Sequence, residues 1–224
     1  MTKMDLRLAI TDISKSYDSK PLLNNCSFTF AGKGVYILTG PNGCGKSTFL
    51  RIAALIEEPD SGTVRYFSGD ELLANDISLR RRITLVLPKL GLFNTTVYGN
   101  MAYGLKIRGT QKRDIEEKVD GYLKSFGLLN KKNQKALTLS SGESQRLGIA
   151  RAMVTEPDIL FLDEPTASVD QKNSEIIEDI IRKMKKQGKP TVIMTTHDAG
   201  QAKRLADYLL RMHKGSLGLS ISPV

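Results

Sequence analysis

Residues 35–48 read Val-Tyr-Ile-Leu-Thr-Gly-Pro-Asn-Gly-Cys-Gly-Lys-Ser-Thr, which is a run of strand composition followed by a glycine-rich loop. From Gly40 to Ser47 the loop satisfies the pattern Gly-x-x-x-x-Gly-Lys-Ser/Thr, and a helical pattern begins near Ser47. Glycines at 40, 43 and 45 allow backbone conformations that a Cβ forbids, so successive N–H groups can point at phosphate oxygens. A strand, this loop and a helix N-terminus together predict a cradle for nucleotide phosphates.

The last residues of the loop bring the charged and metal-binding groups. Lys46 can reach the β and γ phosphates, and the Ser47 hydroxyl is placed to bind Mg²⁺. The predicted nucleotide-binding set is Gly40, Pro41, Asn42, Gly43, Cys44, Gly45, Lys46, Ser47 and Thr48.

A second chemical element follows the apolar run Ile159–Leu162, which ends in the adjacent carboxylates Asp163 and Glu164. A buried parallel strand would carry both to the sheet edge where the phosphate cradle lies. We expect Asp163 to hold Mg²⁺ and Glu164 to orient or deprotonate the water that attacks the γ-phosphate.

The pattern along the chain predicts an α/β fold. Short apolar or β-branched runs at 8–13, 35–39, 84–87, 159–162 and 191–195 are strand candidates, and helical spacing lies between them. Residues 96–157 show helical patterns without a clear strand, and residues 208–219 resemble a closing hairpin. We therefore expect a single domain over 1–224 with a helical segment of about 96–157 inserted in it.

Composition excludes several classes of protein. The chain of 224 residues is 40% hydrophobic and 25% charged, which is ordinary globular usage, and two cysteines cannot form a disulfide framework. A reducing compartment fits best, and no run approaches the roughly 18 apolar residues of a membrane span. The formal charge of +9 allows nucleic acid, anionic lipid or a phosphate-rich ligand as partner.

The segment Leu139-Ser140-Ser141-Gly142-Glu143 resembles the signature motif of ATP-binding cassette (ABC) transporter ATPases. The likeness covers about residues 8–217 and implies a P-loop NTPase of the ABC type. The resemblance implies a mainly parallel core sheet, an N-terminal antiparallel β part and a helical signature subdomain. It also implies ATP as the nucleotide, hydrolysed with Mg²⁺.

In that family the signature acts on the nucleotide of a second subunit. The resemblance implies a homodimer packed head to tail on ATP binding, in which the signature of one copy contacts the ATP held by the other. The residues that would make this contact are Ser140, Ser141, Gly142 and Glu143.

Other positions match the family one at a time. Tyr17 stands where an aromatic residue stacks on adenine, and His197 stands at the switch histidine that hydrogen-bonds the γ-phosphate. Ser168 and Asp170 lie in a segment that resembles the D-loop along the dimer seam. Pro88 stands where the family has a glutamine that touches Mg²⁺ and the attacking water. Because proline has no side-chain amide, either water or a neighbour such as Lys89 fills this role, or the metal is less well coordinated.

The resemblance implies an ATPase that drives solute import through separate transmembrane permease subunits. A solute-binding protein would serve the same system, and residues 93–109 are most similar to importers of tungstate or molybdate oxyanions. We expect a cytoplasmic protein that is peripheral on the inner face of the cell membrane. An exporter ATPase is the alternative, and a soluble ABC ATPase acting on nucleic acid or ribosomes is less favoured because neither a coiled-coil insertion nor a second cassette is present.

Overall fold

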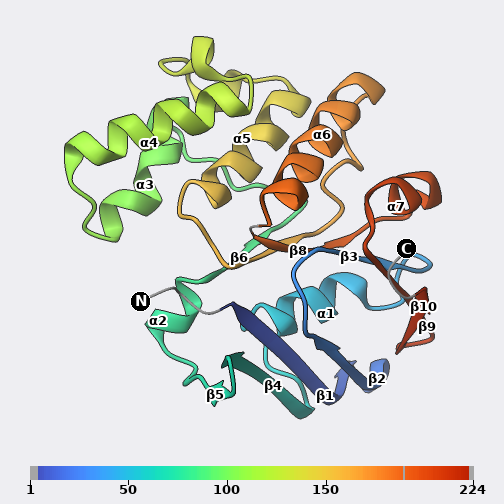
Figure 1. The fold of residues 1–224 in the computed structure, drawn as a ribbon. Coiled ribbons are helices and arrows are strands. Elements are labelled where there is room, and N and C mark those ends of the chain that lie inside the picture. Colours follow the sequence, from blue (N-terminus) through green and yellow to red (C-terminus); the bar gives the residue numbers. More distant parts are fainter. Residues whose placement is uncertain (1–4, 189, 222–224) are drawn as a thin grey trace.

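The computed structural model describes residues 5–188 and 190–221, and these form two β-sheets (Figure 1). The smaller sheet is antiparallel and has the strand order β2-β1-β4-β5. Its strands are β1 (Leu6–Tyr17), β2 (Lys20–Phe30), β4 (Ser61–Ser68) and β5 (Glu71–Leu72). This sheet is the N-terminal antiparallel part that the family resemblance implied.

The larger sheet has the order β10-β9-β3-β8-β7-β6, and all neighbouring strands except β10 and β9 run parallel. Its strands are β3 (Val35–Thr39), β6 (Ile83–Val86), β7 (Ile159–Leu162), β8 (Thr191–Thr195), β9 (Tyr208–His213) and β10 (Ser216–Ile221). The predicted mainly parallel core sheet and the closing hairpin are therefore confirmed.

Side chains of the central strands point alternately to the two faces of the larger sheet, and this divides the core into two parts. Along β3, Val35 and Ile37 face one hydrophobic cluster, whereas Tyr36 and Leu38 face the other. Since successive side chains of a strand point to opposite faces, a continuous apolar run is what a sheet covered on both sides requires.

Different helices cover the two faces of the larger sheet (Figure 1). Helix α1 (Lys46–Ala53) packs its apolar side chains between the two sheets, and α2 (Ile77–Arg80) precedes β6. The opposite face is covered by α3 (Val97–Ile107), α4 (Lys112–Ser125), α5 (Ser141–Met153), α6 (Gln171–Gln187) and α7 (Ala199–Leu205). Residues 96–157, all described, hold α3 to α5, the 3₁₀ turns Leu129–Lys131 and Ala136–Thr138, and one isolated bridge between Thr96 and Lys135.

In the part of the chain that the structure describes, every helix falls short of the length and apolar character that a bilayer crossing requires.

Candidate functional site

Several of the predicted site residues follow strands that end along one edge of the larger sheet. Strands β3, β8, β7 and β6 are neighbours and run parallel, so their carboxyl ends lie together. Gly40 follows β3, Asp163 follows β7, His197 comes two residues after β8, and Pro88 comes two residues after β6. The sheet order thus assembles segments that are more than 150 residues apart in the sequence.

Two glycines shape the phosphate loop. Gly40 has φ +154° and Gly45 has φ +103°, both in the region that L side chains avoid. A Cβ on Gly40 would lie 2.3 Å from the carbonyl oxygen of Met212, and one on Gly45 would lie 2.5 Å from Leu23 Cδ2. The chain therefore has no room for a larger residue at either end of this loop, while the tip at residues 41–43 is exposed to solvent.

Lys46 is held inside the loop by the loop's own backbone. Its side chain is buried, and Nζ donates hydrogen bonds to the carbonyl oxygens of Gly40 at 2.9 Å and Pro41 at 3.0 Å. An ammonium carries three protons, so this arrangement fixes a positive charge against backbone carbonyls at the N-terminus of α1. Next to it, Ser47 is half-buried, and Thr48 Oγ1 accepts a hydrogen bond from Arg51 at 3.0 Å.

Thr195 connects the two carboxylate residues after β7. The Thr195 hydroxyl donates to Asp163 Oδ1 at 2.8 Å. Thr195 Oγ1 also accepts a hydrogen bond from the backbone N–H of Glu164 at 2.9 Å. Asp163 and Thr195 are both buried, so this hydroxyl satisfies a carboxylate that burial alone would destabilise. The sequence did not identify Thr195 as a site residue, although its place at the end of the neighbouring parallel strand could have done so.

Glu164 and His197 face each other across this edge. His197 Nδ1 lies 3.5 Å from Glu164 Oε2, and the His197 side chain is 60% exposed whereas that of Glu164 is 25% exposed. Glu164 has φ +47°, an uncommon conformation for a residue with a Cβ, and its N–H bond to Thr195 holds it there. The backbone thus turns the carboxylate out of the strand direction and toward the histidine.

The donor set fits a magnesium ion that is shared with a phosphate ligand. Ser47 offers a hydroxyl and Asp163 a carboxylate, which are hard oxygen donors of the kind that Mg²⁺ prefers. Within residues 5–188 and 190–221, no three His, Cys, Asp or Glu side chains gather closely enough to form a metal cage. Mg²⁺ commonly takes only one or two protein ligands beside substrate phosphates, so a sparse set is the expected one.

The signature segment forms the capped start of α5. The Ser140 side chain accepts the Glu143 N–H at 3.3 Å, and Glu143 Oε2 accepts the Ser140 N–H at 3.0 Å, which is a reciprocal capping box. Lys131 Nζ also lies 2.9 Å from Glu143 Oε1. The Ser140 N–H, followed by Lys131, lowers the pKa of Glu143. Ser140 and Ser141 are exposed, whereas the Glu143 carboxylate is turned back onto its own helix.

Gly142 is needed for packing as well as for an open helix tip. A Cβ at Gly142 would lie 2.1 Å from Asn173 Cγ. Asn173 accepts a hydrogen bond from Arg146 and donates one to Asp170 at 2.8 Å, and Asp170 caps α6 by accepting the Asn173 N–H. Asn173 therefore ties the signature helix to the segment that resembles the D-loop, in which Ser168 is exposed. Asn173 was not among the predicted site residues, because no local motif marks it.

Side chains of α1 and of the segment after it hold Tyr17 in place. Tyr17 is 42% exposed, and its hydroxyl donates to Glu57 and accepts from Arg51 at 3.3 Å. Arg51 also bonds Thr48, so the exposed ring is tied to the helix that begins at the phosphate loop. An exposed aromatic face in this position is compatible with stacking on an adenine base.

Pro88 lies on an exposed loop that is anchored by its later residues. Arg151 of α5 donates to the carbonyl oxygens of Leu90 and, at 3.0 Å, of Gly91. A Cβ on Gly148 would lie 2.4 Å from Leu90 Cδ2, so the Leu90 side chain packs directly against the backbone of α5. The loop after β6 is thus packed on the signature helix, which links the two segments mechanically.

The chain is similar to known proteins over most of its length. Residues 23–167 match the ABC transporter family. The chain is 36% identical over 213 residues to the tungstate uptake system ATP-binding protein of Peptoclostridium acidaminophilum, covering 95% of this chain and 97% of that protein. It is 35% identical over 222 residues to a phosphate import ATP-binding protein of Natronomonas pharaonis, covering 94% and 78%. The structure of cbiO1 from Clostridium perfringens, part of the ABC transporter complex cbiONQ, superimposes with a TM-score of 0.83 at 28% identity, covering 96% and 88%.

The family match spans more than half of the chain, and the fold of a solved family member covers nearly all of it. The resemblance found in the motifs is therefore confirmed, and the chain belongs to the ABC transporter family, in which it is an ATP-binding subunit with ATPase activity.

Proposed function

We propose that two copies of this chain bind ATP between them, head to tail, and hydrolyse it to drive solute import through separate permease subunits. The observation that carries the shared site is the placement of two helices. Helix α1, which starts at the phosphate loop, packs on one face of the larger sheet, and α5, which starts at the signature, packs on the other (Figure 1). The exposed tip at Ser140 and Ser141 is thereby available to a second copy.

The chemistry follows from the groups at the sheet edge. Lys46 and the loop N–H groups neutralise the phosphoryl oxygens, and Glu164 accepts the proton of the attacking water. His197, beside Glu164, donates to the γ-phosphate, and Tyr17 stacks on the adenine. Mg²⁺, when bound by Ser47 and Asp163, supplies further positive charge to the phosphates. The signature of the partner closes the site and favours the ATP-bound dimer.

Replacement of the proposed base tests the shared site directly. Glu164→Gln keeps the volume and the phosphate contacts but removes proton acceptance, so ATP with Mg²⁺ should convert the variant into a stable dimer. Size-exclusion chromatography with light scattering measures this, with ADP as the nucleotide control and Lys46→Ala added as the binding control. If Glu164→Gln stays monomeric with ATP at high protein concentration, the shared-site proposal is wrong.

The import role rests on the relatives and on one exposed surface. The similar proteins are named for tungstate uptake, phosphate import and spermidine/putrescine import. Phe93 and Tyr103 are 42% and 50% exposed, their ring centroids are 4.7 Å apart, and Ile107 is 62% exposed on the same helix as Tyr103. An exposed apolar group of this kind fits a contact with a permease subunit at the inner face of the membrane.

The tungstate relative supports an oxyanion such as tungstate or molybdate as the imported solute, delivered by a solute-binding protein. Co-purification from the native membrane tests the transport role, because a permease should be captured by the wild type and lost with Phe93→Ser. Capture of nucleic acid that nuclease treatment removes would instead favour a soluble ABC ATPase.

A further inference from the structure

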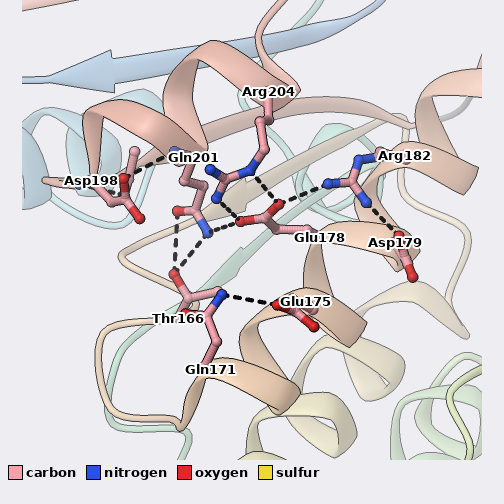
Figure 2. Close-up of polar contacts among 10 residues, drawn as sticks. Thr166, Gln171, Glu175, Glu178, Asp179, Arg182, Asp198, Gln201 and Arg204 are labelled. Carbon is pink, nitrogen blue, oxygen red and sulfur yellow. Dashed lines mark hydrogen bonds and ion pairs between the residues drawn. The ribbon is translucent and has the colours of Figure 1, made fainter.

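Glu178 of α6 is a buried carboxylate with several cationic or polar neighbours (Figure 2). Arg204 of α7 donates to it through Nη2 at 2.7 Å and Nε at 3.0 Å, and Arg182 donates at 2.8 Å. Gln201 Nε2 adds a contact at 3.3 Å. Burial of a charge is costly unless it is paired, so these donors keep Glu178 ionised and fix α7 against α6.

The Gln201 side chain continues from Glu178 to the loop after β7 (Figure 2). The Gln201 amide is buried and lies 3.0 Å (Nε2) and 3.2 Å (Oε1) from Thr166 Oγ1. The Gln201 backbone N–H also bonds Asp198 Oδ1 at 3.0 Å, which caps the start of α7.

These contacts end beside the two groups proposed to act on the γ-phosphate. Thr166 comes two residues after Glu164, and Asp198 directly follows His197. The Glu164 and His197 side chains approach each other at 3.5 Å, and the loops that carry them are joined from behind by Gln201. A side chain that is held at its base is a better-oriented catalytic group.

We propose that Gln201, held by Glu178, is a positioning residue for ATP hydrolysis: it fixes the Glu164 loop against the His197 loop through Thr166. The proposal rests on the proposed roles of Glu164 and His197. It predicts that loss of the Gln201–Thr166 contact lowers the rate of the chemical step and leaves ATP binding intact.

The test cuts the contact from each end. Gln201→Leu and Thr166→Val should each lower kcat about tenfold, with the KM for ATP changed less than about twofold. Thr166→Ser keeps the hydroxyl and should restore the rate. The double variant should be no slower than either single variant, because the two substitutions remove the same contact. Gln134→Leu is the matched control, since Gln134 Nε2 makes the same kind of bond to Thr138 Oγ1 at 2.9 Å, and its kcat should match the wild type.

Thermal unfolding of every variant separates positioning from stability. A purely structural role predicts a lower Tm with kcat per folded molecule unchanged, and that result for Thr166→Val would overturn the proposal even if Gln201→Leu does not fold. Additive losses in the double variant would overturn it as well. Glu164→Gln is assayed alongside: if it retains turnover, the proposed function and this positioning role both fail, whereas an inactive Glu164→Gln beside fully active Gln201→Leu and Thr166→Val defeats the positioning role alone.

Discussion

At the scale of single residues, one hydroxyl fixes the geometry of two carboxylate residues. Thr195 Oγ1 donates to the Asp163 carboxylate and accepts the N–H of Glu164, whose φ is positive. The hydroxyl therefore couples the metal-binding candidate to the candidate base. Removing it leaves a buried carboxylate without this donor and frees the strained peptide that directs Glu164.

Thr195→Val should cost about 1–3 kcal/mol of stability and lower kcat more than it raises the KM for ATP. Chemical denaturation and steady-state ATPase assays measure the two effects. Thr195→Ser retains the hydroxyl and should recover most of the rate. Thr191→Val, at the other end of β8, is the control for the same change in a buried strand. Equal kcat values for Thr195→Val and wild type would show that the bridge has no catalytic role.

Lys131 pairs with Glu143 of the signature, whose negative charge would lie near the partner's phosphates in the proposed dimer. The Lys131 ammonium lies 2.9 Å from the Glu143 carboxylate. Lys131→Met should weaken the ATP-driven dimer of Glu164→Gln about fivefold, because like charges then face each other. Glu143→Gln in the same chain should restore it, and Lys135→Met is the exposed control. Dimer dissociation constants from analytical ultracentrifugation measure this, and no rescue by Glu143→Gln would contradict the charge argument.

At the scale of elements, the fully buried strands were predicted with their bounds, whereas most half-exposed strands of the smaller sheet were not. β3, β7 and β8 are apolar runs with the predicted bounds, because strands covered on both faces need such runs. β2 and β4 were missed, since exposed residues interrupt their apolar ones, and β1 extends beyond the predicted 8–13 to Leu6–Tyr17. The phosphate loop, Asp163, Glu164 and His197 follow from local motifs. Thr195, Gln201 and Asn173 act through contacts between distant segments, which no local pattern encodes.

The contact between α6 and α7 gives a dependence of stability on pH. The Arg204 guanidinium, followed by Gln201 and Arg182, outweighs burial and lowers the pKa of Glu178. A depressed folded-state pKa contributes stability that is complete above the unfolded pKa of about 4.3 and disappears as the pH falls through the folded value. Thermal unfolding should therefore show Glu178→Gln less stable than wild type by about 3 kcal/mol at pH 7.

The difference in stability between Glu178→Gln and wild type should become smaller below pH of about 4, where the wild-type carboxyl also becomes neutral. Glu175→Gln, on the exposed side of the same helix, should track the wild type across the whole range. If this stability difference stays constant or grows toward acid pH, the charge of Glu178 is not what stabilises the contact between α6 and α7.

At the scale of the whole molecule, the two helices whose tips we propose to bind phosphate, α1 and α5, pack on opposite faces of the larger sheet, so each copy should supply half of each site. Two inactive variants can then complement each other. Lys46→Ala disables the phosphate loop of its own chain and leaves the signature of that chain intact. Ser141→Glu keeps the phosphate loop, and it should fold because an acidic residue in the first turn of α5 suits the helix dipole, although it repels the partner's phosphates.

Mixing the two variants in equal amounts should generate ATPase activity that neither has alone, up to about one quarter of the wild-type rate, since half of the dimers are mixed and each mixed dimer has one intact site. Turnover measured against mixing ratio should peak at equal amounts. The control combines Lys46→Ala with Lys46→Ala/Ser141→Glu, which leaves no intact site in any pairing and should stay inactive. If the complementary mixture is as inactive as this control while each variant is folded, each nucleotide is handled within one chain, and the two-copy site is wrong.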